Sequence, residues 1–451
     1  MRRAWVAVAA VALSAVAVAH LPSRAHATTA KPNIVFVLSD DQTIDGLARA
    51  LPFLNRGPGG HWVRFPNATV NEALCCPSRA TILSGQYAFH TGVLRNGDGA
   101  RLDDRRTVAT ALHAAGYRTS LVGKYLNLYG QSFGVNGYVP PGWDDWHAYT
   151  SRVSYYDYSL NENGAIHSFG SKAADYSTDL LAGRAKSFVT TAPEPFYLQF
   201  TPFAPHVPSI PAPRYVGDTR FDGLNLATPD FNETDVSDKP AYVRSTAKLT
   251  TSEAKAQLAK HKKSLLALLA LDDAVSSLYN ALQTRGVLDR TVIVFMTDNG
   301  YVYGEHRLTG AKTCPYTECV GTQMLVRYPG ATARTDHTVV TNADLTSTFA
   351  DLAGTTPALA QDGRSLRPLL ASTTGLGRDG VLIEWPGGGK LECPKFWGVR
   401  TQRWKYVEYA TGERELYDEV NDPYELVNHA GDSAYASVRK QLATQLAGMH
   451  P

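Results

Sequence analysis

The sequence predicts an α/β fold, built on a mainly parallel sheet with helices on both faces and followed by a smaller α+β subdomain with an antiparallel sheet. Short apolar runs, rich in β-branched or aromatic residues, alternate with helical patterns and indicate the main part. Loop-like sequence after residue 371, followed by short aromatic runs, indicates the subdomain. With 451 residues, the chain is long enough for both parts. We expect the large domain to span residues 31–371 and the subdomain residues 376–451.

Residues 1–27 have the pattern of a signal peptide. Arg2 and Arg3 precede an apolar run over residues 4–19, and Ala25-His26-Ala27 offers a small-x-small cleavage site. An uncleaved membrane anchor is the alternative, but the run is short and rich in alanine. We therefore expect cleavage after Ala27 and secretion of the mature chain. No later segment looks long and apolar enough to span a membrane.

The charge balance gives no indication of an anionic macromolecular partner. The formal net charge is +2, and removal of the signal peptide with its three arginines changes it to −1. We therefore expect neither a nucleic acid nor a stable membrane partner. Any positively charged site for an anionic substrate must be local.

Four apolar runs predict buried strands in the main domain. Periodicity alone does not separate such short runs from buried helix. We interpret them as strands because they are rich in β-branched and aromatic residues and because helical patterns lie between them. The runs are Ile34–Leu38, Thr119–Val122, Phe196–Phe200 and Val292–Met296.

The clearest helical pattern begins at Thr250. Thr250 and Glu253 have the spacing of a capping box, in which each side chain hydrogen-bonds to the backbone of the other. Apolar residues then recur at helical spacing as far as Leu282, and Arg285-Gly286 is a stop signal. We expect one long helix between these signals.

Polar residues follow each predicted strand at its carboxyl end. Each of them alone is what a solvated loop would carry. Ligands of open α/β sheets bind outside the carboxyl ends of the strands, so the coincidence indicates one site at one edge of the sheet. The residues are Asp40 and Asp41 after the first run, Lys124 after the second, His206 after the third, and Asp298 and Asn299 after the fourth.

Four of these residues supply hard oxygen ligands. They are Asp40, Asp41, Asp298 and Asn299, and no Cys or His clusters with them in the sequence. Oxygen ligands favour Ca²⁺, with Mg²⁺ as the alternative, and make zinc a poor choice. For each residue alone, a plain turn at the end of a strand is the simpler interpretation.

The segment Cys75-Cys76-Pro77-Ser78-Arg79, which continues to Leu83-Ser84-Gly85, is the most specific motif in the chain. Adjacent cysteines form a disulfide only with backbone strain, so a bond within the motif is not expected. The motif resembles the C-x-P-S-R signature of type I sulfatases. The resemblance implies that a formylglycine-generating enzyme oxidises Cys75 to formylglycine, the catalytic aldehyde, and that Arg79 is the signature arginine.

The same resemblance implies roles for the other candidates. The residue pairs Asp40-Asp41 and Asp298-Asn299, which follow two of the predicted strands, would together hold one calcium ion beside residue 75. Lys124 and Lys312 would neutralise charge on the sulfuryl oxygens together with Arg79. His206, which is flanked by Pro205 and Pro208, would protonate the leaving alcohol. The simpler alternatives are that the lysines are surface residues that aid solubility and that the histidine has a structural role.

The resemblance covers nearly the whole mature chain and is closest to the glycan 6-O-sulfatases, that is, the N-acetylglucosamine-6-sulfatases and heparan endosulfatases. The shared stretches include Gly123–Asn127, Pro140–Trp143 and Asp298–Tyr301. It implies an alkaline-phosphatase-like α/β/α sandwich and the hydrolysis of sulfate monoesters, with a sulfated small molecule or glycan as substrate, either a sulfated sugar or an aryl sulfate. Leu126 stands where many arylsulfatases have a histidine, so the role of that histidine is not carried over.

Two other functions remain open from the sequence. A phosphonate or phosphate ester hydrolase of the same fold would need the same motifs. A non-catalytic glycan-binding protein on a sulfatase scaffold would lack catalytic residues, and here nearly all are present.

Five cysteines are an odd number for an exported protein and indicate one reactive thiol. If Cys75 is modified, the remaining four allow three pairings, and the close spacing of Cys314 and Cys319 favours that pair.

Overall fold

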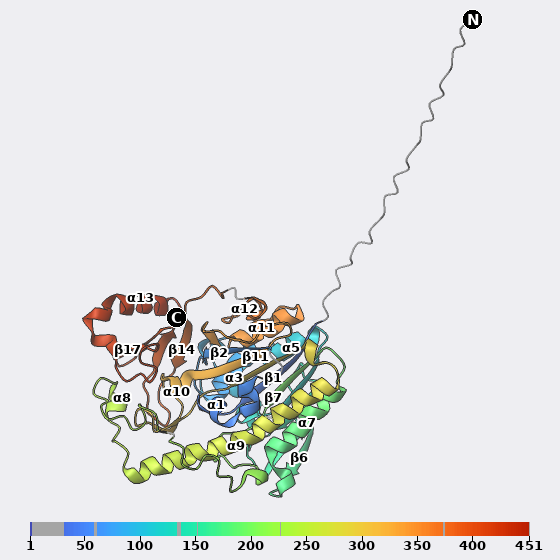
Figure 1. The fold of residues 1–451 in the computed structure, drawn as a ribbon, viewed down its shortest axis with the longest axis horizontal. Coiled ribbons are helices and arrows are strands. Elements are labelled where there is room, and N and C mark those ends of the chain that lie inside the picture. Colours follow the sequence, from blue (N-terminus) through green and yellow to red (C-terminus); the bar gives the residue numbers. More distant parts are fainter. Residues whose placement is uncertain are drawn as a thin grey trace. The chain divides into compact units, whose positions relative to one another are not determined.

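The structure is a computed structural model that describes residue 1 and residues 31–57, 61–132, 137–150, 152–225, 227–372 and 375–450. The predicted signal peptide lies outside the described residues. Residues 31–450 form one compact unit built on a large mixed sheet and a smaller antiparallel one (Figure 1).

The large sheet has a parallel centre and antiparallel additions at both sides. Its order is β12-β2-β11-β8-β1-β7-β3-β4-β5-β6, with β13 also paired to β2. The neighbours from β8 to β4 all run parallel, whereas β11 is antiparallel to β2 and β8, and β5 is antiparallel to β4 and β6. Its strands are β1 (Asn33–Ser39), β2 (Trp62–Thr69), β3 (Arg118–Gly123), β4 (Asp145–Tyr149), β5 (Tyr158–Glu162), β6 (Ala165–Phe169), β7 (Phe196–Thr201), β8 (Thr291–Thr297), β11 (Gly321–Arg327), β12 (Arg334–Thr335) and β13 (Val340–Thr341).

The helices cover both faces of this sheet. In Figure 1, α7 and α9 lie together on one side, and α5, α11 and α12 lie on the other. The helices are α1 (Gly46–Ala50), α2 (Pro52–Arg56), α3 (Cys75–Ser84), α4 (Ala88–Thr91), α5 (Val108–Ala114), α6 (Tyr129–Ser132), α7 (Ser177–Thr191), α8 (Ala241–Arg244), α9 (Thr251–Thr284), α10 (Thr317–Val320), α11 (Asp344–Ala353), α12 (Arg367–Ala371) and α13 (Ala436–Ala447).

Strand β1 shows why the sheet needs both layers. Ile34, Phe36 and Leu38 belong to the hydrophobic core that includes residues of α3, α5 and α11. Val35 and Val37 belong to the core formed with α7 and α9. Successive side chains of a strand point to opposite faces, so a continuous apolar run must be buried on both. The four predicted strands are confirmed as β1, β3, β7 and β8.

Helix α9 confirms the predicted helix from its first turn to its last. The Glu253 amide donates to the Thr250 hydroxyl at 3.3 Å, and the Thr250 amide donates to the Glu253 carboxylate at 2.8 Å, which is the expected capping box. By length and composition alone, α9 could span a membrane, so the expectation that no later segment would do so was wrong. Its most apolar window is 72% buried inside the protein, and packing against the sheet accounts for the apolar composition.

The C-terminal part contains the predicted antiparallel sheet, with α13 on one face. Ile383 and Phe396 lie in the same core as the large sheet, whereas Leu382 and Val399 pack against Leu442 of α13. The strands are β14 (Val381–Trp385), β15 (Phe396–Arg400), β16 (Trp404–Tyr409) and β17 (Arg414–Asp418), and the short pair β9 (Val302–Tyr303) and β10 (Thr309–Ala311) forms a separate hairpin.

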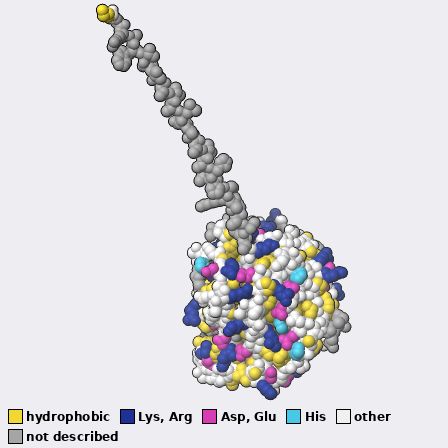
Figure 2. Space-filling model, turned by 90° about the vertical axis from the view of Figure 1, so that its right-hand side faces the viewer, with side chains coloured by type: hydrophobic (Ala, Val, Ile, Leu, Met, Phe, Trp, Pro, Cys, Tyr) yellow, Lys and Arg dark blue, Asp and Glu magenta, His cyan; other side chains and the backbone are white. Residues whose placement is uncertain are grey.

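The predicted disulfide is confirmed. Cys314 and Cys319 are bonded, with their Cα atoms 5.7 Å apart. Cys75, Cys76 and Cys393 are free and buried. The surface shown in Figure 2 carries lysine and arginine side chains interspersed with aspartate and glutamate.

Candidate active site

Four strand ends meet at one edge of the large sheet, and the backbone joins them there. Asp40, directly after β1, forms a bridge with Pro205 in the segment after β7. The Asp298 amide, after β8, donates to the carbonyl of the last residue of β1 at 3.0 Å, and the Lys124 amide, after β3, donates to the Thr201 carbonyl at 2.8 Å. The predicted convergence of these segments is therefore present in the fold.

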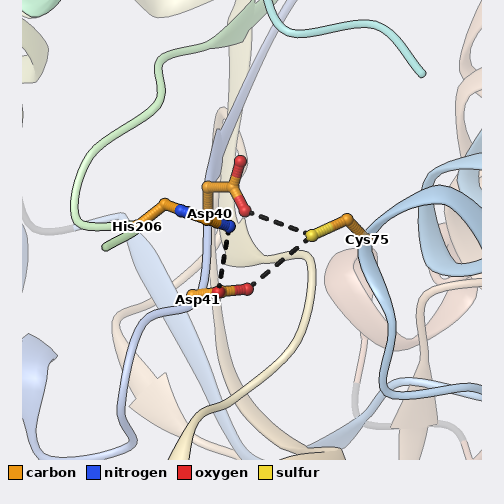
Figure 3. A group of neighbouring side chains, drawn as sticks. All are labelled: Asp40, Asp41, Cys75 and His206. Atoms are coloured by element: carbon orange, nitrogen blue, oxygen red, sulfur yellow. Dashed lines mark hydrogen bonds and ion pairs between the residues drawn. The ribbon is translucent and has the colours of Figure 1, made fainter. Parts of the chain in front are cut away.

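Cys75 faces this edge from the first turn of α3. Its sulfur lies 3.5 Å from Asp40 Oδ1 and 3.8 Å from Asp41 Oδ1 (Figure 3). The Lys312 ammonium group lies 2.7 Å from the same sulfur. Residue 75 is only 1% exposed, and it occupies the positive end of the helix dipole. An anion that forms at this position is stabilised by the helix and by the lysine.

Arg79 lies one turn after Cys75 on α3, so both side chains project from the same side of the helix. Its Nε atom donates to Asp298 Oδ2 at 2.8 Å, and its Nη1 atom donates to the Lys124 carbonyl at 2.7 Å. The Nη2 atom lies 3.4 Å from Asp40 Oδ2. The side chain is buried and holds two carboxylates and a backbone segment in place.

Two lysines neutralise the first pair of aspartates. Lys124 Nζ lies 2.5 Å from Asp40 Oδ2, and Lys312 Nζ forms an ion pair with Asp41 Oδ1. Burial opposes ionisation of Asp40, but its attraction to Lys124 and the other nearby cations outweighs burial and holds its pKa below the usual range. These contacts therefore favour the ionised carboxylate of Asp40.

The thiol of Cys75 has the opposite tendency. Burial, followed by the Asp40 charge, raises its pKa above the ordinary value, although Lys124 and Lys312 act against the rise. A buried thiol that keeps its proton is a poor nucleophile. The unmodified cysteine is thus poorly suited to begin a displacement reaction.

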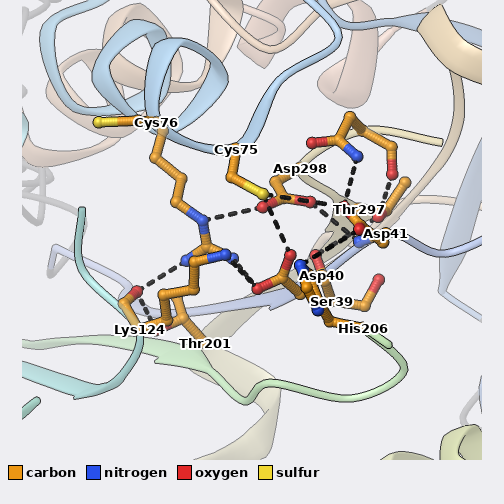
Figure 4. Close-up of polar contacts among 12 residues, drawn as sticks. Ser39, Asp40, Asp41, Cys75, Cys76, Lys124, Thr201, His206, Thr297 and Asp298 are labelled. Carbon is orange, nitrogen blue, oxygen red and sulfur yellow. Dashed lines mark hydrogen bonds and ion pairs between the residues drawn. The ribbon is translucent and has the colours of Figure 1, made fainter. Parts of the chain in front are cut away.

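The oxygen donors at the edge fit a hard divalent cation. Asp40, Asp41 and Asp298 point toward one another beneath the Cys75 sulfur (Figure 4). Burial and the Asp40 charge raise the pKa of Asp298, so these acids repel each other in the absence of a further cation. The buried Oδ1 atom of Asn299 has no hydrogen-bond partner among the residues that the structure describes, although its Nδ2 atom donates to Asp41 at 2.7 Å. A calcium ion would use these oxygens and relieve the repulsion.

His206 lies at the mouth of the site. Its Nε2 atom is 3.4 Å from Asp41 Oδ2, and its Nδ1 atom lies 2.7 Å from the Val207 carbonyl. The ring stacks on Phe203 with the centroids 4.5 Å apart, and a quarter of the side chain is exposed. The carbonyl contact requires a proton on Nδ1, so Nε2 is the atom that faces the site.

The structure thus brings together every candidate from the sequence, but the pocket outside has walls that sequence reasoning missed. A pocket of about 550 Å³ opens onto Asp41, His206 and Lys312. A hollow of similar size between α7 and α9 contains none of these groups. The missed lining residues include Arg95, Asn96, Tyr301, Trp385 and Lys390.

Apart from Tyr301, which belongs to the shared Asp298–Tyr301 stretch, these walls come from segments that carry no recognisable motif. The Arg95 guanidinium lies over the Trp385 ring, 4.6 Å from its centroid, although the two residues are far apart in the sequence. Lys390 Nζ donates to the Gly310 carbonyl at 3.0 Å, next to the segment that carries Lys312. Only the folded chain shows that the C-terminal sheet contributes to the pocket.

Comparison with known proteins identifies the family. Residues 32–355 match the family model described as sulfatase. The chain belongs to the sulfatase family. Residues 304–450 also match the model for the C-terminal region of N-sulphoglucosamine sulphohydrolase. The resemblance inferred from the Cys75 motif is therefore confirmed.

Similar proteins include sulfatases of animals. Human N-acetylglucosamine-6-sulfatase is 33% identical over an alignment of 384 residues, and the alignment covers 81% of this chain and 69% of the human protein. The extracellular sulfatase SULF-1 homolog of Drosophila melanogaster is 33% identical over an alignment of 376 residues, which covers 80% of this chain but 33% of that protein. The chain thus spans about a third of the length of the fly relative.

Solved structures confirm the fold. The structure of BT4656 in complex with its substrate D-glucosamine-2-N,6-O-disulfate superposes with a TM-score of 0.77 at 24% identity, covering 93% of this chain and 97% of that one. The predicted alkaline-phosphatase-like sandwich with a smaller antiparallel C-terminal sheet is the fold of this family.

Proposed function

We propose that this chain is a secreted hydrolase of sulfate monoesters, acting on sulfated sugars through residue 75 and one bound calcium ion. One observation carries the proposal: Cys75, at the start of α3, lies against Asp40, Asp41 and Lys312, with His206 across Asp41 from it. The family membership gives the reaction class, and the names of the relatives give the sugar.

Residue 75 would act as formylglycine. When formed, this group supplies a hydrated aldehyde with one hydroxyl to attack sulfur and a second to expel the sulfate afterwards. The chain's own contribution is to bury the residue and hold it beside Lys312. A formylglycine-generating enzyme would have to modify the chain before the site closes, because Cys75 is 1% exposed in the folded protein.

The calcium ion would be held by Asp40, Asp41, Asp298 and Asn299 together with residue 75. Its positive charge would favour an ionised nucleophile and would stabilise negative charge on the sulfuryl oxygens. Mg²⁺ is the alternative occupant, but it demands a more regular six-oxygen geometry.

The basic side chains divide into two groups in this proposal. Lys124 and Lys312 present ammonium groups to the space above the aspartates and would stabilise the charge that develops on the transferred sulfuryl group. Arg79 would be a positioning residue, since its Nε and Nη1 atoms are already bound to Asp298 and to the Lys124 carbonyl. It would fix the carboxylates rather than contact the substrate.

His206 would supply the proton for the leaving alcohol from Nε2. The Val207 carbonyl and the Phe203 ring fix the orientation of the imidazole, and its partial exposure lets a substrate oxygen approach. The sugar would occupy the adjoining pocket, where Trp385 offers a ring and Arg95 and Lys390 offer positive charge. These groups suit a sugar that carries further anionic substituents.

Secretion and removal of residues 1–27 are part of the proposal. A relative is named as an extracellular sulfatase, and the sequence pattern of the first 27 residues supports export. N-terminal sequencing of the mature protein from the culture medium should begin after Ala27.

The reaction is tested by measuring turnover of matched esters. The protein, prepared together with a formylglycine-generating enzyme, should release sulfate from N-acetylglucosamine-6-sulfate. A phosphonate ester of the same leaving group should react much more slowly. Faster turnover of the phosphonate would assign the chain to phosphonate ester hydrolysis, and no turnover of either ester by formylglycine-containing protein would indicate a non-catalytic protein.

A further inference from the structure

A second cluster of potential metal ligands lies outside the site described above. It consists of Asp230, His306 and Glu318, whose ligand atoms all lie within 4.8 Å of one another. Asp230 and His306 are fully buried, and 19% of the Glu318 side chain is exposed. None of the three takes part in the proposed sulfatase reaction.

The backbone forces these side chains together. Phe231 and Glu305 form a bridge, and the His306 amide donates to the Asp230 carbonyl at 2.8 Å. His306 adopts a left-handed backbone conformation, with φ of 50°, which is uncommon for a residue with a side chain. Its ring stacks on Tyr316, with centroids 4.1 Å apart. The backbone conformation and the stacking on Tyr316 thus hold the imidazole in one orientation.

The hydrogen bond at the other ring nitrogen prepares His306 to bind a cation. Nδ1 lies 2.7 Å from Glu233 Oε2, so it carries the proton and Nε2 presents a lone pair. A carboxylate on the far nitrogen is the usual support for a histidine that binds a metal, because it fixes the tautomer and raises the basicity of the ring. Nε2 has no hydrogen-bond partner in the described part of the chain.

Carboxylate oxygens of the other two ligands also lack hydrogen-bond partners in the described part of the chain. Neither oxygen of the Asp230 carboxylate has a hydrogen-bond partner, and Glu318 Oε2 has none either, among the residues described. Glu318 Oε2 lies 3.9 Å from His306 Nε2, which is too far for a hydrogen bond. The gap is shorter than the sum of two zinc–ligand bonds of about 2.1 Å each. One ion between His306 Nε2 and Glu318 Oε2 could therefore contact both, and a ligand atom of Asp230 lies within 4.8 Å of each.

The surrounding charges leave the cluster short of positive charge. Lys405 pairs with Glu425 at 2.5 Å and with Glu419 at 3.1 Å. Lys239 lies 3.6 Å from Glu233. Within the described residues, no lysine or arginine forms an ion pair with Asp230 or Glu318. Buried carboxylates without a paired cation are strongly disfavoured, so the cluster must hold either a cation or protons.

We propose that Asp230, His306 and Glu318 form a second metal site that binds Zn²⁺. The imidazole nitrogen favours zinc over calcium, which prefers oxygen ligands alone. Three protein ligands with room for water at a fourth position are a common zinc arrangement. The ion would tie the segment around Asp230 to the stretch from β9 to α10, which carries His306, Lys312 and Glu318.

The competing account is that the cluster holds protons. Burial raises the pKa of both Asp230 and Glu318, so neutral acids could replace the cation. The two accounts differ in what the purified protein contains and in what zinc does to its stability.

The test uses the full chain, stripped with a chelator and dialysed against Ca²⁺ and Zn²⁺ together. Elemental analysis of the wild-type protein should find one equivalent of tightly held zinc. The Asp230→Asn and His306→Gln variants should lose the zinc and keep their calcium. Asp235→Asn, a change at an exposed carboxylate of the same segment, is the matched control and should keep both metals.

Thermal unfolding and cobalt absorption give readouts that are independent of sulfatase activity. Zinc should raise the unfolding midpoint of the wild type and of Asp235→Asn, but not of Asp230→Asn. Co²⁺ bound to the wild type should give visible absorption bands that change in His306→Gln. If a variant fails to fold, Glu318→Gln takes its place. A wild-type protein that holds no zinc, or variants that hold as much as the wild type, would overturn the proposal in favour of protons.

Discussion

The ammonium group of Lys312 lies 2.7 Å from the sulfur of Cys75, although 237 positions separate the two residues in the sequence. Lys312 follows the β9–β10 hairpin, and Cys75 begins α3. The lysine also pairs with Asp41, so it joins the candidate nucleophile to a candidate metal ligand. The positive charge of Lys312 would therefore stabilise negative charge on the sulfuryl group that is transferred.

Lys312→Ala should therefore lower kcat for a sugar sulfate by about 10²–10³-fold, the usual effect of removing one group that stabilises transition-state charge. Lys390→Ala is the control, because Lys390 lines the same pocket and contacts the Gly310 carbonyl rather than Cys75. It should alter KM more than kcat. Steady-state kinetics of sulfate release separate the two variants, and equal kcat losses would argue against a transition-state role for Lys312.

His206→Ala should affect substrates according to their leaving groups. A general acid contributes about 10²–10⁴-fold, and its contribution grows as the leaving group becomes more basic. A sugar alkoxide needs the proton, whereas a nitrophenolate barely does. The variant should lose most of its activity on N-acetylglucosamine-6-sulfate and keep much of its activity on nitrophenyl sulfate.

Equal losses on the two esters would make His206 a binding or structural residue. Phe203→Leu is a useful companion, since it removes the ring on which His206 stacks but leaves the imidazole in place. We expect it to show a weaker form of the same leaving-group dependence.

Chelation should abolish turnover, and calcium should restore it. The ion would lose one of about six to eight oxygen ligands in Asn299→Ala, so this variant should need a higher calcium concentration for half-maximal activity. Asp235→Asn, a change at an exposed carboxylate, is the control and should behave like the wild type. Activity measured against free calcium concentration checks this, and a wild-type calcium response in Asn299→Ala would remove Asn299 from the ligand set.

Glu384→Gln should flatten the pH dependence of stability. Glu384 is buried, and burial raises its pKa from 4.5 to about 7. The folded state therefore holds this proton more tightly than the unfolded state, so stability falls as pH rises between these two values. Glu72, a second buried carboxyl close enough to interact with Glu384, adds to the same slope.

Glutamine cannot ionise, so above about pH 7 the variant should be more stable than the wild type, by at most about 3 kcal/mol, since each unit of pKa shift corresponds to about 1.4 kcal/mol. Below about pH 4.5 the two proteins should be equally stable. Urea denaturation at several pH values measures the difference. Parallel curves over the whole range would show that Glu384 is already neutralised by another group.

The sequence was sufficient for the elements that carry strong local signals. β1 and β8 are buried on both faces, which leaves uninterrupted apolar runs. The capping box at Thr250 and the spacing of Cys314 and Cys319 are equally local. Because the ends of parallel strands share one edge of a sheet, the convergence of Asp40 with Asp298 followed from the strands themselves.

Other features depended on pairings that leave no local pattern. β2 contains Pro66 and has mixed burial, and its pairing with β11 shifts register. Its sequence therefore lacks the uninterrupted apolar run or the strict alternation that predicts a strand. Arg95 and Trp385 meet only after the C-terminal sheet has packed against the large one. The cluster around Asp230 and His306 likewise depends on a bridge between two irregular segments.

Mass spectrometry of the peptide that contains residue 75 shows whether the active protein carries formylglycine at this position. Active wild-type protein should show sulfur and two hydrogens of Cys75 replaced by one oxygen, and the modified fraction should rise in proportion to specific activity. Cys75→Ala should fold, carry no aldehyde and release no sulfate. Full activity in a preparation whose Cys75 is an intact thiol would contradict the account.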